Sequence, residues 1–137
     1  MFHALEQLIP HRPPMRWINA LTACTATTAT ATAIFAENDF AVVDGQVLET
    51  ALVECVAQTV AAALGQRAQV GAAKPGAAAH GMLVAASNFQ IRSRPAAGQT
   101  LHIEIRETKR LGPMLMITGT ITCEGQEIAS GELSLYA

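Results

Sequence analysis

Alternating apolar and polar residues predict that most of this chain is β-sheet. The clearest alternation covers residues 100–110, where Leu101, Ile103 and Ile105 share one face of a strand. The residues between them, including His102 and Glu104, share the other face. Similar patterns predict strands over 81–92, 114–123 and 127–136, and an alternation of threonine and alanine predicts one over 20–35.

One segment departs from this pattern, because residues 46–64 are apolar nearly all the way round a helix. Gly65 is expected to end the helix. Apart from Glu49, Glu54 is the only charged residue in this range, and Gln58 follows one turn later on the same face. A carboxylate on such a helix is expected to be buried, where it either finds partners or stays protonated.

The order of the remaining elements predicts the fold class. A short helix is expected over residues 3–9, a stiff proline-rich segment over 9–15 and a loop over 37–45. A strand, one central helix and four more strands predict an α+β fold, with an antiparallel sheet wrapped around the helix, as a single domain of residues 1–137. Because such a sheet covers only one side of the helix, a second subunit is expected to cover the rest.

Composition and charge exclude several classes of protein. Half of the residues are hydrophobic and the formal net charge is −2, without a basic stripe, so neither disorder nor nucleic-acid binding is indicated. Cys24, Cys55 and Cys123 lie far apart in the sequence, so they are expected to be core residues of a protein in a reducing compartment. Their spacing is not that of a zinc site. The sequence contains no nucleotide-binding motif, so a nucleotide cofactor is not indicated. Without a secretory signal or an uncharged run of membrane-spanning length, a cytoplasmic protein is expected.

Glu54 is the strongest candidate for chemistry on the residues alone. Buried carboxylates are costly, and proteins often keep them for function. The alternative interpretation is structural, in which Glu54 pairs with an arginine, caps a loop or lies at a subunit contact.

Three motifs resemble those of the 3-hydroxyacyl-[acyl-carrier-protein] dehydratases. Residues 8–15, LIPHRPPM, resemble the "LPHRxPF/M" opening of that family, and residues 54–58, ECVAQ, resemble its "E-x-M-A-Q" helix motif. Residues 81–101 resemble its strand and "RPVxPGDxL" turn. The resemblance spans about residues 7–105. It implies the hot-dog fold, which usually works as a dimer or as a larger assembly of dimers.

The chain departs from this family at the usual catalytic loop. That loop carries a histidine in "GHFPxxPxxPG", whereas residues 38–45 read NDFAVVDG and place Phe40 at the histidine position. The sequence is more similar to the divergent dehydratase-like branch of aryl-polyene biosynthesis clusters. In that branch, His11 is the histidine available for chemistry.

The resemblance implies roles for several residues. Glu54 is expected to be the acid or hydroxyl-orienting group, and His11 the base. Substrate-binding roles are expected for Gln58, which would hold Glu54 or a water, and for Gly45 and Met82.

Other interpretations of the same residues stay open. His11 alternatively pins the proline-rich turn, and His80 is the reserve base. Arg12 either meets the phosphopantetheine phosphate or a carrier-protein acid, or is solvated at the surface.

The function that follows is dehydration of a 3-hydroxyacyl thioester in fatty-acid or polyene-type lipid biosynthesis. The only cofactor expected is the phosphopantetheine that the substrate carries. The expected partners are an acyl carrier protein, the acyl thioester and a second subunit, either an identical chain or a paralogue. Two alternatives remain: an acyl thioesterase that needs no histidine base, and a non-catalytic acyl-binding partner of an active dehydratase.

Overall fold

The structure is a computed structural model. Six of its strands form one antiparallel sheet in the order β1-β2-β6-β7-β8-β5. The described residues are 4–13, 15–69 and 82–136, and the side chains of residues 82–84 are outside the description. The strands of the sheet are β1 (Ile18–Cys24), β2 (Thr28–Ile34), β5 (Met82–Ile91), β6 (Thr100–Leu111), β7 (Met114–Cys123) and β8 (Gln126–Tyr136). The other elements are α1 (Leu5–Leu8), a small hairpin of β3 (Val42–Val43) and β4 (Gln46–Val47), and α2 (Glu49–Gln69).

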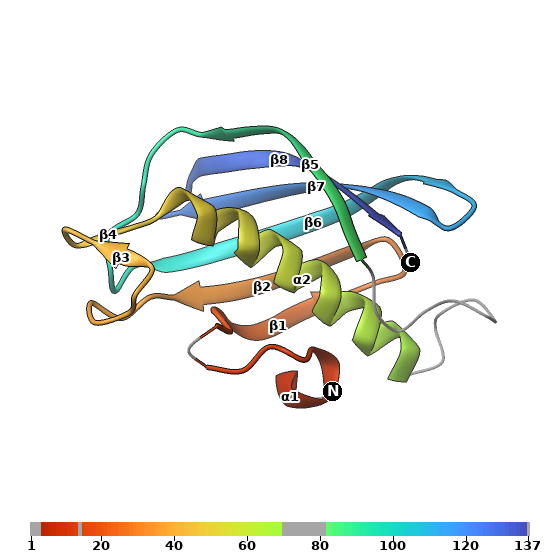
Figure 1. The fold of residues 1–137 in the computed structure, drawn as a ribbon, viewed down its shortest axis with the longest axis horizontal. Coiled ribbons are helices and arrows are strands. Elements are labelled where there is room, and N and C mark those ends of the chain that lie inside the picture. The colour runs from red at the N-terminus through yellow and green to blue at the C-terminus, as the bar shows by residue number, and fades with distance from the viewer. Residues whose placement is uncertain (1–3, 14, 70–81, 137) are drawn as a thin grey trace.

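The long helix α2 lies across one face of the sheet, and α1 lies beside the C-terminal half of α2 (Figure 1). Alternate residues are buried in β2, β7 and the first half of β6, the three central strands that contact α2, as the sequence pattern predicts for β6. The approach is close in the middle of the sheet, where Val56 of α2 fills the space that a side chain at Gly119 would need. The expected antiparallel sheet packed on one apolar helix is therefore confirmed.

The prediction of one strand over residues 20–35 is wrong, because this segment folds into the hairpin of β1 and β2. The Thr25 hydroxyl accepts hydrogen bonds from the backbone N–H groups of Thr27 (3.3 Å) and Thr28 (3.0 Å) and so closes the turn. Threonine favours strands and also forms such turns, so the alternation alone does not mark the reversal.

The predicted bounds of the central helix, 46–64, are also wrong at both ends. Residues 46 and 47 form β4, which pairs with β3 inside the segment expected to be a loop. The turn between these strands holds Asp44 and Gly45 at φ of 53° and 76°, as tight hairpins require. The predicted helix over residues 3–9 is shorter as well, since α1 covers only Leu5–Leu8.

Gly65 does not end α2, because the helix continues to Gln69. Gly65 faces α1 instead, and a Cβ at this position would lie 2.5 Å from the Leu8 carbonyl oxygen. The glycine is therefore explained by the close approach of the two helices rather than by a helix stop.

The substitution Gly65→Ala is expected to destabilise the protein by about 1–3 kcal/mol, because the added methyl overpacks the α1–α2 contact. On an exposed helix the same change would stabilise by about 1 kcal/mol. Urea unfolding measures the free energy, with Gln69→Ala as the control variant, because Gln69 is the exposed last residue of the same helix. An increase in stability for Gly65→Ala would contradict the packing seen here.

Within the described residues, no helix combines the length and the apolar character that crossing a membrane requires.

Candidate active site

His11 and Glu54 meet in the structure although they are far apart in the sequence. His11 Nε2 lies 3.4 Å from Glu54 Oε1. The other ring nitrogen of His11, Nδ1, is buried and has no hydrogen-bond partner among the described residues. Of the two ring nitrogens, Nε2 is therefore the one that can interact with Glu54. A separation of this kind is usual for catalytic pairs before substrate binds.

Gln58 connects Glu54 to the segment that carries His11. Its Nε2 donates hydrogen bonds to Glu54 Oε1 (3.3 Å) and to the Met15 carbonyl (2.8 Å). Its Oε1 accepts from the backbone N–H groups of Trp17 (2.9 Å) and Ile18 (3.4 Å). Gln58 thus holds Glu54, as expected, but both donors and both acceptor positions of the amide are used by protein atoms. The arrangement supports a positioning role rather than direct contact with substrate.

The expectation that Glu54 is buried is wrong, since 37% of its side chain is exposed. In α2 the partly buried residues Val53, Glu54, Ala57 and Ala61 form a stripe that the rest of the protein covers incompletely, although Ala57 and Ala61 also pack against the core. The spacing of this stripe follows one face of the helix. The pattern of an all-apolar helix did not reveal that Glu54 lies on the incompletely covered face.

The loop before α2 is held by an aromatic group in place of the histidine of the related motif. The Trp17 ring packs at 5.5 Å from Phe40 and at 5.9 Å from Phe35, centroid to centroid. The Trp17 indole N–H donates to Asp39 Oδ1 (3.3 Å), which also accepts from the Ala41 N–H (2.8 Å). Phe40 is 56% exposed, and its ring offers no group for proton transfer.

The structure gives less information about the other predicted site residues. Gly45 lies in the β3–β4 turn, where its carbonyl accepts from the Ala97 N–H at 2.9 Å. Met82 is the first residue of β5, but its side chain is outside the described residues, as is the whole of His80. The substrate-binding roles of Gly45 and Met82 therefore stay predictions.

Cys55 follows Glu54 on α2 but is completely buried. Burial raises the pKa of this thiol far above its usual range, and the carboxylates of Glu54 and Asp39 raise it further. Such a thiol carries almost no reactive thiolate. Cys55 is therefore a core residue rather than a nucleophile.

A thiol reagent is expected to label partly exposed Cys24 in the native protein, well before buried Cys55 and Cys123. In urea all three should react at similar rates. Peptide mass spectrometry after brief maleimide exposure measures the order. Equal labelling of Cys55 in buffer and in urea would show that α2 opens readily.

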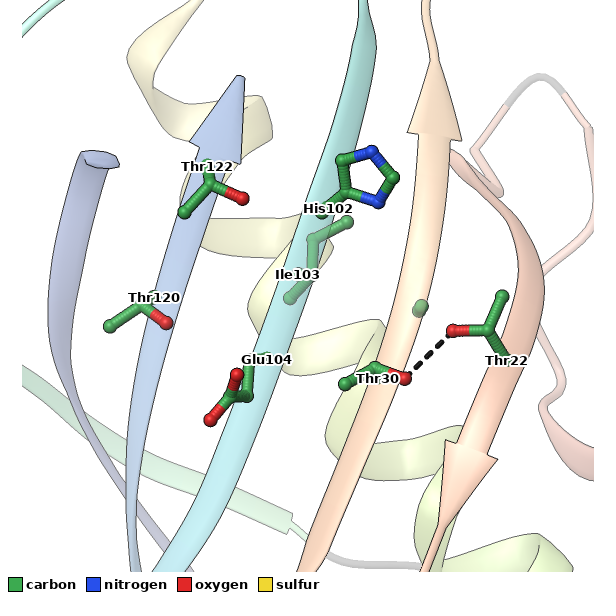
Figure 2. Close-up of a pocket in the computed structure, with 8 residues that line it drawn as sticks. Thr22, Thr30, His102, Ile103, Glu104, Thr120 and Thr122 are labelled. Carbon is green, nitrogen blue, oxygen red and sulfur yellow. Dashed lines mark hydrogen bonds between the residues drawn. The ribbon is translucent and has the colours of Figure 1, made fainter. Parts of the chain in front are cut away.

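A depression of about 230 Å³ lies on the face of the sheet opposite α2. Figure 2 shows His102 and Glu104 of β6 there among threonines of the neighbouring strands, with α2 behind the sheet. The one hydrogen bond drawn joins the hydroxyls of Thr22 and Thr30 at 2.7 Å. His102 is exposed, as the strand pattern predicts, and the sheet separates it from Glu54. Among the described residues, no three His, Cys, Asp or Glu side chains gather as a metal site requires.

Solved structures identify the fold around this site as the hot-dog fold. The chain is similar to "The Dehydratase Heterocomplex ApeI:P from Xenorhabdus doucetiae", with a TM-score of 0.83 and 19% identity over 99% of this chain and 91% of that one. It is also similar to the Escherichia coli PaaI protein from the phenylacetic acid degradation operon, with a TM-score of 0.70 and 10% identity over 85% and 81% of the two chains. A hypothetical thioesterase with coenzyme A from Streptococcus pneumoniae TIGR4 gives a TM-score of 0.69 at 11% identity, over 85% and 83%.

The chain belongs to the ApeP-like family, described as ApeP dehydratase, whose model matches residues 3–137. The resemblance to the dehydratase-like branch of aryl-polyene clusters is therefore confirmed. No curated protein sequence matches the chain. Fold and family together define a hot-dog protein of the acyl-thioester class.

Proposed function

We propose that this protein eliminates water from a 3-hydroxyacyl group held as a thioester on an acyl carrier protein. The observation that carries the proposal is the contact between His11 Nε2 and Glu54 Oε1. A base and an acid at one point suit an elimination, which removes a proton from C2 and a hydroxyl from C3. Membership of the ApeP-like family supports the same reaction.

In the proposed mechanism, neutral His11 takes the C2 proton through Nε2. Protonated Glu54 gives its proton to the C3 hydroxyl, which leaves as water while the C2–C3 double bond forms. The carboxyl proton is restored when His11 passes its proton to Glu54, so the pair ends the cycle unchanged. No metal or redox cofactor takes part in this scheme, and phosphopantetheine arrives with the substrate.

The incompletely covered stripe of α2 supports a binding place for the acyl chain of the substrate. Val53, Ala57 and Ala61 are half-buried apolar residues on the same helix face as Glu54. The opposite side of the helix is filled, since Val56 packs against Gly119. We therefore place the acyl chain along the stripe, outside the contact between helix and sheet.

The same stripe supports the binding of a second subunit, which would enclose the acyl chain and exclude water from it. The related ApeI:P structure is a heterocomplex, so a paralogue is the partner that we favour over an identical chain. We place this assembly in the cytoplasm, where acyl carrier proteins work.

One observation favours a second function, that of a non-catalytic partner. Phe40 stands where related dehydratases have their loop histidine, and its ring cannot act as a base. In this alternative, the chain binds acyl groups or stabilises a paralogue that performs the elimination.

A mass-spectrometric assay separates these functions. The purified chain, alone and with a co-expressed dehydratase paralogue, is incubated with 3-hydroxyacyl carrier protein. Loss of one water from the acyl group, abolished in His11 and Glu54 variants, is the expected result. Dehydration that survives both substitutions in the complex would favour the partner role, and release of free acid would identify a thioesterase.

A further inference from the structure

We infer that Arg12 is a positioning residue, which fixes the turn that presents His11 to Glu54. The inference rests on the proposed function, because it assigns His11 a part in the reaction. It concerns neither a phosphate nor a carrier-protein contact, the two partners that the sequence alone suggests for an arginine here.

The guanidinium of Arg12 binds three backbone carbonyls of the preceding segment. Nη1 donates to the carbonyls of Ile9 (2.7 Å) and His11 (2.9 Å), and Nη2 donates to that of Glu6 (2.9 Å). Both N–H groups of Nη1 are therefore used within the turn. The Glu6 carboxylate is engaged separately, by Arg16 at 2.7 Å.

The positions of the prolines explain why these carbonyls need an arginine. If the helical pattern continued beyond α1, the Glu6 carbonyl would accept from residue 10 and the Ile9 carbonyl from residue 13. Both residues are prolines, which have no N–H to donate. Arg12 supplies the missing donors, and its positive charge is favourable near carbonyls at a helix C-terminus.

The backbone of Arg12 is linked to Gln58 by further hydrogen bonds. Its carbonyl accepts from the N–H groups of Met15 (2.8 Å) and Arg16 (3.1 Å). The Met15 carbonyl in turn accepts from Gln58, which also holds Glu54. His11 is thus fixed from the α1 side by Arg12, while the following residues and Glu54 are fixed by Gln58.

Lysine at this position keeps the charge but loses the planar fork that spans several carbonyls. Arg12→Lys is therefore expected to lower kcat by roughly 10-fold to 100-fold, as small displacements of a catalytic group do, while KM for the carrier substrate changes little. Arg106→Lys is the matched control, since Arg106 is an exposed residue on the outer face of β6. A rise in KM that depends on salt, with kcat unchanged, would instead mean that Arg12 binds the carrier and would overturn the inference.

A double-mutant cycle tests whether Arg12 acts through His11. In a His11→Ala background, Arg12→Lys is expected to cause no further loss of rate. An equal loss in both backgrounds would overturn the inference.

A measurement that does not depend on enzymatic activity keeps the test of Arg12 separate from the test of the proposed function. In the complete protein, the two imidazole nitrogens of His11 are expected to give distinct ¹⁵N resonances, because Nδ1 is buried while Nε2 faces Glu54. Arg12→Lys should bring them together, whereas Arg106→Lys should not. Unchanged His11 resonances in Arg12→Lys would overturn the positioning role. A protein that shows the expected change and no dehydration would refute only the proposed function.

Discussion

Glu54→Gln is expected to lower the rate of dehydration by about 100-fold to 10,000-fold, the range that general acid catalysis contributes. The amide cannot deliver a proton to the leaving hydroxyl, yet it matches the carboxyl in shape. Its oxygen can still accept the hydrogen bond that Gln58 donates to Glu54 Oε1. The expected loss therefore falls on kcat rather than on folding, and single-turnover mass spectrometry with 3-hydroxyacyl carrier protein measures it.

His11→Ala is expected to cause a loss of similar size, and the double variant little more than either single one. Residues that act as one unit show such non-additive effects. Glu49→Gln provides the control, because Glu49 is an exposed residue in the first turn of the same helix. Full activity in Glu54→Gln, with Glu49→Gln also active, would remove the carboxyl from the mechanism.

Gln58→Leu is expected to destabilise the folded protein by about 2–5 kcal/mol. The change leaves the backbone groups of Met15, Trp17 and Ile18 without their partner, and each buried unsatisfied group costs about 1–3 kcal/mol. Gln58 itself is completely buried, so water cannot simply replace the lost bonds. Urea unfolding followed by circular dichroism gives the free energy.

Gln69→Leu is the matched control for this measurement, since Gln69 is the exposed last residue of α2. Its stability is expected to stay within about 0.5 kcal/mol of the original protein. The Gln58 variant should also lose dehydration activity at temperatures where it remains folded, because Glu54 and the His11 segment are no longer held together. A Gln58→Leu protein with unchanged stability would contradict the hydrogen-bond arrangement described here.

Local patterns in the sequence predicted most strands of the sheet and placed Glu54 and Gln58 on one side of the helix. The alternation over β6 defines its buried and exposed faces because side chains of a strand point in opposite directions at each step. The four-residue spacing of Glu54 and Gln58 places them together because a helix turns every 3.6 residues. The motif around His11 indicated a candidate base, but its distance from Glu54 does not follow from either pattern.

Tertiary packing decided the features that the sequence could not. Glycine often ends a helix, yet Gly65 is explained by the close approach of Leu8 and not by the end of α2. Gln58 binds backbone atoms of residues 15, 17 and 18, which carry no side-chain signal. The partial exposure of Glu54 depends on which face of α2 the rest of the protein covers incompletely. Propensity and periodicity act over a few residues, whereas the meeting of His11 and Glu54 depends on long-range contacts that only the folded chain creates.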